Sequence, residues 1–199
     1  MCSVRPFMIH HKRVFGLAAI LFSVASCTAA DADLDDTEDV EDTETTEDGL
    51  STGFGLPFPA GAAYVISQGP HNGFSHVAPY NQHAVDFAMP IGAKVVASAA
   101  GRIVYDGWFQ NEIRVIIDHG GNRCTLYTHL NRSTHYVGQR VRRGEHLGES
   151  GATGNVTAPH LHWGMINCND WTSRAVVPTD ELGTSYPAGK LARSKNKLK

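Results

Sequence analysis

The residues in this chain best placed to do chemistry are two histidines separated by one position, in His160-Leu161-His162. If Leu161 lies in a β-strand, both imidazoles project from the same face of that strand, with Cα atoms roughly 6.5 Å apart. One imidazole could then bind a metal ion while the other contacts a water molecule or a substrate beside it. The plainer alternative is a solvated surface pair, but two inward-facing histidines would each need a hydrogen-bond partner.

A carboxylate and a third histidine extend this set. Asp86 stands inside the apolar segment Ala84 to Ala88, where a carboxylate is costly unless it is paired or bound to a metal. His129 stands in a second apolar segment, Leu126 to Leu130. A catalytic zinc needs about three protein ligands and one open position, and it makes hydroxide available near neutral pH. These residue types therefore predict a hydrolytic zinc site in which histidines transfer protons and stabilise charge on a carbonyl oxygen.

Short apolar segments that alternate with Gly, Asn and Pro are the elements that must position these side chains. No amphipathic stretch is long enough for a helix of more than two turns, so the pattern predicts a mainly β fold, a compact antiparallel sheet or sandwich. His119 to Asn122 has the composition of a hairpin connection. The expected strands are Ala63–Ser67, Ala84–Ala88, Lys94–Ala97, Gly101–Asp106, Ile113–Asp118, Arg123–His129 and Leu161–Ile166.

The N-terminus has the pattern of an export signal over residues 1–27. Basic residues precede an apolar run, Val14 to Val24, that is too short to span a bilayer stably. The run ends in a small-small-Cys sequence that resembles the bacterial lipobox, so Cys27 is the expected lipidation site; ordinary cleavage with an incidental Cys27 is the alternative. Thr28, in place of the Asp that often marks inner-membrane retention, favours the outer membrane facing the periplasm, or the cell surface.

The rest of the chain consists of an acidic segment followed by a longer basic one. Residues 31–48 hold 11 of the 20 acidic residues and no Lys or Arg, whereas the chain from Leu50 onward holds 14 basic and 9 acidic residues, a balance of +5. Residues 28–52 are therefore expected to form an acidic, disordered linker that holds a folded domain off the membrane. We expect the folded domain over residues 53–187 and a basic, flexible tail over residues 188–199.

Two cysteines, Cys124 and Cys168, remain outside the export signal. An exported domain with two cysteines can form one disulfide. Two buried free thiols are the alternative, because a sequence does not supply the Cα separation that a disulfide requires.

Seven pieces of the sequence, taken in order, resemble the lysostaphin/LytM-type zinc metallopeptidases, which hydrolyse peptide bonds in peptidoglycan. The resemblance spans about Pro70 to Ile166, most of the folded domain, and seven ordered pieces are far more specific than one short motif. The pieces are Ala84–Gly92, Ala97–Val104, Ile117–Gly120, Leu126–Leu130, Val137–Gln139, Gly148–Gly154 and Pro159–Trp163.

The resemblance implies a role for each candidate residue. Asp86 and His162 correspond to zinc ligands, with one Zn²⁺ per domain. His160 corresponds to the general base, and His129 to the residue that orients water or stabilises the tetrahedral oxyanion. The family fold is a compact antiparallel β structure with the zinc in a groove between loops. The glycines expected to let the loop before His160 pass close to the site are Gly151 and Gly154.

The first zinc ligand departs from the commonest family pattern, which has a histidine four residues before the aspartate. That position is Gln82 here, a poor zinc ligand. A subset of the family takes this ligand from an upstream Ser-His piece, which makes His76 the preferred candidate. His83 is the alternative, although a regular strand would turn it to the face opposite Asp86 unless a bulge intervened. The remaining options are His71 or no histidine at this position.

These expectations converge on a zinc-dependent endopeptidase that hydrolyses peptide bonds in peptidoglycan stem peptides or cross-bridges. The alternative is a non-catalytic domain of the same type that binds cell wall and regulates another wall hydrolase. A secreted zinc protease that acts on proteins would share the same chemistry. The expected partners are peptidoglycan and, through a lipid on Cys27, a membrane. No nucleic acid partner is expected, and the domain is expected to be a monomer.

Overall fold

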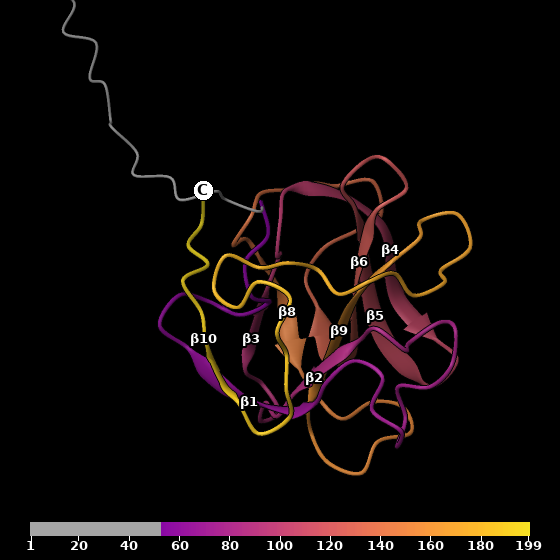
Figure 1. The fold of residues 1–199 in the computed structure, drawn as a ribbon. Helices are drawn as coiled ribbons and strands as arrows, with labels where there is room; N and C mark the ends of the chain where they lie inside the picture. Colours follow the sequence, from indigo (N-terminus) through magenta and orange to yellow (C-terminus); the bar gives the residue numbers. More distant parts are fainter. Residues whose placement is uncertain (1–52) are drawn as a thin grey trace, which may run out of the picture. The chain divides into compact units, whose positions relative to one another are not determined.

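A computed structural model describes residues 53–199, which form ten β-strands and no helix (Figure 1). The expected export signal, its Cys27 and the acidic linker lie outside the described residues. The strands are β1 Ala63–Gln68, β2 Val85–Phe87, β3 Lys94–Val96, β4 Gly101–Phe109, β5 Glu112–Asp118, β6 Cys124–Ser133, β7 Arg140–Val141, β8 His146–Ser150, β9 Leu161–Ile166 and β10 Leu191–Arg193.

The strand pairings are antiparallel, which confirms the expected fold class. The main path through the sheet runs β10-β1-β2-β9-β6-β5-β4-β7, and β8 joins β3 to β6 beside it. The path makes neighbours of β2, β9 and β6, which carry Asp86, His162 and His129. Three residues that are far apart in the sequence are therefore brought to adjacent strands.

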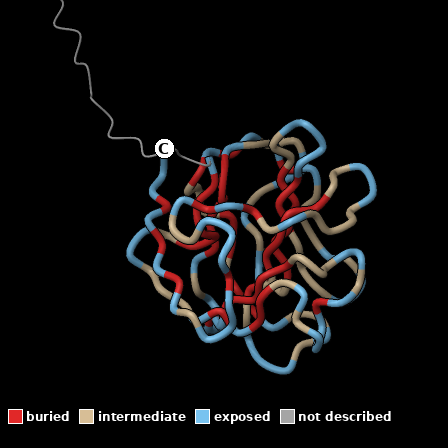
Figure 2. Tube along the Cα trace, in the orientation of Figure 1, coloured by how far each residue is buried: buried red, intermediate tan, exposed pale blue. Residues whose placement is uncertain are grey.

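The two faces of these central strands differ sharply. Val85 and Phe87 on β2, and Leu161 and Trp163 on β9, are buried in the main hydrophobic core. Figure 2 shows in red the buried stretches of the central strands. Because side chains alternate between faces along a strand, Asp86 and its partners lie on the other side of the sheet. The hydrophobic face thus fixes the register that aligns the polar residues.

Seven of the ten strands lie where the sequence pattern predicts them, with ends that differ by a few residues. The hairpin between β5 and β6 is confirmed: Gly120, Gly121 and Asn122 have φ values of 81°, 61° and 58°. These left-handed conformations suit Gly and Asn. The strands that were not predicted are β7, β8 and β10.

The expectation of a flexible C-terminal tail over residues 188–199 is wrong. Leu191–Arg193 forms β10 and pairs with β1, and Ala192, Ser194 and Asn196 are buried. The Asn196 side chain donates hydrogen bonds to the carbonyl oxygens of Leu56 and Ala97, at 2.8 and 3.0 Å. The tail is fixed because it completes the edge of the sheet and satisfies buried backbone groups.

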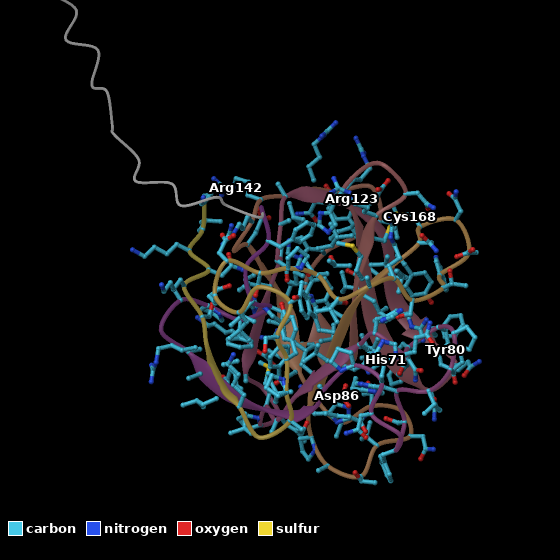
Figure 3. All side chains as sticks on the ribbon, viewed as in Figure 1. His71, Tyr80, Asp86, Arg123, Arg142 and Cys168 are labelled. Atoms are coloured by element: carbon cyan, nitrogen blue, oxygen red, sulfur yellow. A yellow bond between two sulfur atoms is a disulfide. The ribbon has the colours of Figure 1, made fainter. Side chains whose placement is uncertain are left out.

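A disulfide joins Cys124, at the start of β6, to Cys168, just after β9, with the two Cα atoms 5.2 Å apart. It ties the loop that follows β9 to the neighbouring strand. Figure 3 shows Cys168 well separated from Asp86. In the described part of the chain, no helix could serve as a membrane span.

Candidate metal centre

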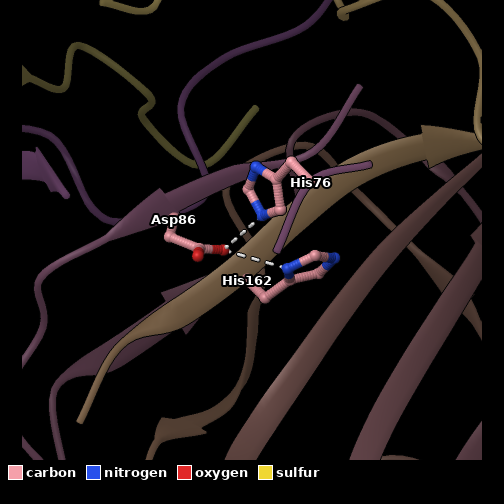
Figure 4. A group of neighbouring side chains, drawn as sticks. All are labelled: His76, Asp86 and His162. Carbon is pink, nitrogen blue, oxygen red and sulfur yellow. Dashed lines mark ion pairs between the residues drawn. The ribbon is translucent and has the colours of Figure 1, made fainter. Parts of the chain in front are cut away.

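Asp86 and His162 are brought together by the pairing of β2 with β9. Their Cα atoms are direct partners in the antiparallel register, so their side chains emerge side by side on one face. His162 Nδ1 lies 2.9 Å from Asp86 Oδ1 (Figure 4). On the other side of Asp86, its register partner on β1 is Gln68, whose Nε2 donates to Asp86 Oδ2 at 3.0 Å.

His76 completes the group from the loop between β1 and β2. Its Nε2 lies 3.2 Å from Asp86 Oδ1, and the coordinating atoms of His76, Asp86 and His162 all lie within 4.8 Å of one another (Figure 4). His76 Nδ1 lies 2.9 Å from the Gly69 carbonyl oxygen, which can only accept, so this nitrogen carries a proton. When the ring is neutral, as a metal ligand must be, Nε2 presents a lone pair to the cluster.

Two buried atoms in this group have no hydrogen-bond partner: His76 Nε2 and Asp86 Oδ1. Burial alone would raise the pKa of the Asp86 carboxyl, but His162 and His76 together hold it well below its usual range. Asp86 is therefore ionised at neutral pH. The facing nitrogen and oxygen atoms of His76, Asp86 and His162 suit a cation, which can take the place of the protons that otherwise hold such a group together.

His160 lies beside this cluster, one residue before β9. Its Nδ1 donates to the Ala158 carbonyl oxygen at 2.9 Å, which leaves Nε2 as an acceptor in the neutral ring. That Nε2 lies 3.7 Å from Asp86 Oδ2. A bridge between His160 and Gly151 fixes the backbone, and a Cβ at Gly151 would lie 2.5 Å from the Asn131 nitrogen. Only glycine fits there, so Gly151 lets the loop before His160 pack closely against β6.

His129 reaches the same face through a break in the regular ladder. The Cα of Thr128 pairs with that of His162, so strict alternation would turn the next residue, His129, away from the cluster. The register of β5 against β6 shifts between Ile113 and Val115, and His129 has a φ of 62°. This bulge re-aims the side chain, at the cost of a left-handed backbone conformation that is unfavourable for a non-glycine residue.

As a result the His129 ring centroid lies 4.7 Å from that of His160 and 5.8 Å from that of His162. His129 Nδ1 donates to the Thr153 carbonyl oxygen at 2.8 Å. Burial, followed by the positive charges that His162 and His160 can carry, lowers the pKa of His129 to about 4. At neutral pH the ring is uncharged, and its Nε2 is an acceptor.

His83, the alternative first ligand, lies elsewhere. Its ring contacts His71 edge to face, with centroids 4.5 Å apart, and its backbone nitrogen donates to Ser173. The cluster around Asp86 contains His76 instead. The segment Val85–Phe87 continues as a regular strand without the bulge that His83 would have required.

The cluster opens into a groove with a volume of about 860 Å³. Asp86, His129, His160 and His162 all line it. Its aromatic and amide lining includes Phe74, Tyr80, Asn81, Phe109, Asn155 and Trp171. Such a groove can accept an extended chain of a peptide's dimensions.

The sequence reasoning missed two polar residues of this groove, Gln68 and Glu112. Gln68 ends β1 and is 7% exposed, and Glu112 begins β5. The signal was weak: each stands at the end of an apolar segment, where a polar residue is ordinarily solvated. Only the strand pairing shows that they face Asp86 and His129.

The comparison with known families agrees with this geometry. The model of peptidase family M23 matches residues 80–177. The chain contains a peptidase M23 domain. The matched segment includes Asp86, His129, His160 and His162 and begins after His76, the residue whose position departs from the commonest pattern. The resemblance read from the sequence is thereby confirmed.

Several bacterial peptidases are similar to this domain. ShyA, a peptidoglycan DD-endopeptidase of Vibrio cholerae, is 44% identical over 96 residues, which are 45% of this chain and 21% of ShyA. ALE-1, a glycyl-glycine endopeptidase of Staphylococcus capitis, is 42% identical over 121 residues, 58% of this chain and 33% of ALE-1. The chain thus spans about a fifth to a third of the length of these curated relatives.

Among solved structures, a zinc-containing peptidase from Vibrio cholerae matches with a TM-score of 0.50 and 28% identity, over 58% of this chain and 37% of that one. The likeness therefore extends from the M23 sequence to the arrangement of its strands.

Proposed function

We propose that this protein is a zinc-dependent endopeptidase that hydrolyses peptide bonds in peptidoglycan stem peptides or cross-bridges. The observation that carries the proposal is the convergence of His76, Asp86 and His162 on one point, with two of their buried atoms lacking hydrogen-bond partners. Three ligands of the nitrogen and oxygen type leave the fourth corner of a tetrahedral zinc open, as hydrolysis requires. Relatives named as peptidoglycan and glycyl-glycine endopeptidases support the substrate class.

The donor set fits zinc in chemistry as well as in number. His76 would bind through Nε2, Asp86 through Oδ1 and His162 through Nδ1, which are the atoms that face one another. The Gly69 carbonyl oxygen accepts a hydrogen bond from His76 Nδ1 and so orients the ring. Gln68 Nε2 donates to Asp86 Oδ2 and so orients the carboxylate. Such outer contacts orient metal ligands. One Zn²⁺ per domain is the expected content.

Zinc held there would supply a Lewis acid that polarises a peptide carbonyl and makes water more acidic. The chain's own residues would do the rest. His160, with Nδ1 committed to the Ala158 carbonyl, offers Nε2 as the acceptor for the proton of the attacking water. His129, with Nδ1 committed to Thr153, offers Nε2 as a second acceptor that orients this water. The groove would hold the substrate chain across both histidines.

Of the two roles that the resemblance implies for His129, the geometry favours the orientation of water. A neutral ring that donates through Nδ1 has no proton on Nε2 with which to stabilise an oxyanion. It becomes a donor only after it has taken up a proton. The low pKa of His129, about 4, supports the neutral form at the start of the reaction.

The test combines metal analysis with product analysis. The purified protein should contain one zinc per chain, and mass spectrometry should find newly released muropeptides after incubation with purified peptidoglycan. Chelation should stop this release and added zinc should restore it, while His162→Ala should lose both metal and activity. A metal-free protein that releases nothing but stimulates a separate wall hydrolase would instead support the regulatory alternative. A denatured protein cut as readily as peptidoglycan would redirect the proposal to general proteolysis.

We also propose that the protein is exported and lipid-anchored through Cys27, at the outer membrane facing the periplasm or at the cell surface. The support is the basic start, the short apolar run and the small-small-Cys ending of residues 1–27. An extracytoplasmic location suits a peptidoglycan substrate, and it suits the Cys124–Cys168 disulfide. Labelling with a fatty acid should mark the wild type and not a Cys27→Ala variant; equal labelling of the two would exclude this anchor.

A further inference from the structure

A carboxylate stands directly beside His129 in the groove. Glu112 Oε2 lies 3.2 Å from His129 Nδ1, the nitrogen that also donates to Thr153. The same oxygen accepts a hydrogen bond from the Thr128 hydroxyl at 3.2 Å. One carboxylate oxygen therefore contacts two consecutive residues of β6, which is possible only because the bulge turns both side chains to the same face.

Glu112 is itself held firmly. Its other oxygen forms an ion pair with Arg114, two residues further along β5 and so on the same face. The Arg114 guanidinium stacks over the Phe109 ring, 3.8 Å from its centroid, and Trp171 lies 5.9 Å away on the disulfide-tied loop. The Glu112 side chain is 15% exposed and that of Arg114 is 14% exposed. A carboxylate this enclosed and paired with a guanidinium keeps a fixed orientation.

The absence of a side chain at Gly154 leaves room for the contact between Glu112 and His129. Gly154 has a φ of 87°, and a Cβ there would lie 3.0 Å from Glu112 Cβ and 3.3 Å from His129 Nδ1. The loop that supplies the Thr153 carbonyl therefore closes tightly over the Glu112–His129 contact. His129 needs such a clamp, because a residue at a bulge is not oriented by the regular ladder.

We propose that Glu112 is a positioning residue for His129. It holds the ring in the tautomer with the proton on Nδ1, so that the Nε2 lone pair faces the groove, and Arg114 holds Glu112 in turn. A carboxylate or carbonyl behind one imidazole nitrogen commonly sets the function of the other. The inference rests on the proposed function, because the effect of this orientation is on hydrolysis.

The kinetic test compares Glu112→Gln with a matched control, Glu145→Gln. Glu145 also lies against a histidine, 3.4 Å from His135 Nε2, but outside the groove. With a soluble cross-linked muropeptide as substrate, we expect Glu112→Gln to lower kcat about 10- to 100-fold, with KM and zinc content unchanged. We expect Glu145→Gln to match the wild type. Unchanged kcat, a raised KM with normal kcat, or loss of zinc would each overturn the proposal.

A second measurement does not depend on activity. In the zinc-free protein at pH 7.5, the two ring nitrogens of His129 should give well-separated ¹⁵N signals, one protonated and one not. In Glu112→Gln these signals should move toward each other, because a neutral amide is a weaker acceptor than a carboxylate. If they stay where they are, Thr153 alone holds the ring and Glu112 has no positioning role. If the wild type neither binds zinc nor hydrolyses muropeptides, the proposed function fails, yet the spectra still decide whether Glu112 holds His129.

Glu112→Asp provides a second test in case Glu112→Gln does not fold. It keeps the charge for Arg114 but withdraws the oxygen from His129 by one methylene. A stable Glu112→Asp protein with reduced kcat and converging ¹⁵N signals supports the proposal, and a fully active one with unchanged signals overturns it.

Discussion

The two faces of the β2–β9 strand pair make opposite contributions to the molecule. On one face Val85, Phe87, Leu161 and Trp163 are each at most 1% exposed and belong to the main core. On the other face, to which the alternate residues point, Asp86, His160 and His162 line the groove. A shift of one residue in register would exchange the two sets. The apolar face therefore secures the alignment that the polar face needs.

Stability and chemistry are therefore separable here at the level of adjacent residues. His160, Leu161 and His162 follow one another, yet the outer two face the groove and the middle one faces the core. Changes on the groove face should alter metal binding or turnover with little effect on folding. Changes on the core face should do the reverse.

The largest expected effect is that of His160→Ala. Zinc content should stay near that of the wild type, because His160 is outside the group His76, Asp86 and His162. Turnover of a cross-linked muropeptide should fall about 10²- to 10⁴-fold, the usual loss when a general base is removed. Metal analysis and single-substrate kinetics check both parts. A variant with near-normal turnover would mean that His160 is not the base.

Next in size is the effect on zinc affinity at the first ligand. His76→Ala should weaken zinc binding by more than the roughly 10- to 100-fold that the loss of an outer-shell contact causes, because a direct ligand is lost. His83→Ala should bind zinc as the wild type does, since its ring packs against His71. Competition titration with a fluorescent chelator measures both. If His83→Ala were the weaker binder, the ligand assignment would be reversed.

Leu161→Ala tests the core face directly between the two histidines. Leu161 is fully buried, so its truncation should lower the free energy of unfolding by about 2–5 kcal/mol. The fraction that remains folded should bind zinc with normal affinity. Urea denaturation of the zinc-free protein measures the loss, with Leu161→Met, expected to cost less than about 1.5 kcal/mol, as the volume-matched control. A loss of zinc affinity in the folded variant would show that the two faces are coupled.

The sequence predicts the regular strands of this fold well. Period-two alternation around Asp86 and around Leu161 places both in strands, and a regular antiparallel pairing then suffices to bring Asp86 and His162 together. The hydrophobic pattern predicts the face on which each residue lies, whereas the pairing of β2 with β9 is a long-range feature that it does not supply. The hairpin between β5 and β6 is equally local, because Gly and Asn permit the left-handed turn.

The irregular part of the site is not encoded in periodicity. His129 faces the groove only because of a bulge, and His76 arrives from a loop, so neither position follows from alternation. The residue pattern singled out His129 as a histidine in an apolar segment, and the family resemblance supplied its role and the choice of His76. Glu112 and Gln68 were missed because each stands at an irregular register, where β5 shifts against β6 and β1 shifts against β2.

The expectation of a flexible C-terminal segment was wrong for a different reason. Residues 191–197 alternate strictly between exposed and buried, but the buried positions are Ala192, Ser194 and Asn196, and two of these are polar. Hydrophobic alternation was therefore absent, although structural alternation was present. Hydrogen bonds replace apolar contact as the force that fixes this segment.

Asn196→Ala tests that interpretation with a smaller effect. Its amide donates to two buried carbonyl oxygens and accepts from Arg143 Nε at 3.1 Å. Loss of these bonds leaves buried groups unsatisfied and should lower the free energy of unfolding by about 1–3 kcal/mol. Lys197→Ala, at an exposed position one step past it, should change stability by less than about 0.5 kcal/mol. Equal denaturation curves for the two variants would mean that the segment adds nothing to the fold.

The smallest expected effect concerns His119, at the turn after β5. Its Nδ1 donates to the Ala100 carbonyl oxygen at 2.8 Å, and its Nε2 lies 2.8 Å from the Thr125 hydroxyl. Burial lowers the pKa of His119 below its ordinary value of 6.5. The unfolded chain therefore takes up this proton more readily than the native protein does. The stability that neutral His119 contributes is complete above pH 6.5, and it is lost as the pH falls from there through the lowered pKa of the folded state.

His119→Asn removes this titration while its amide can still donate to Ala100. The free energy of unfolding of the zinc-free protein should fall more steeply for the wild type than for the variant between pH 7 and pH 5.5. Because His119 lies outside the groove, the histidines around Asp86 titrate alike in both proteins, and their effect cancels in the difference. Parallel curves would show that the turn tolerates a charged His119, and that proton sensitivity is confined to the groove face of the sheet.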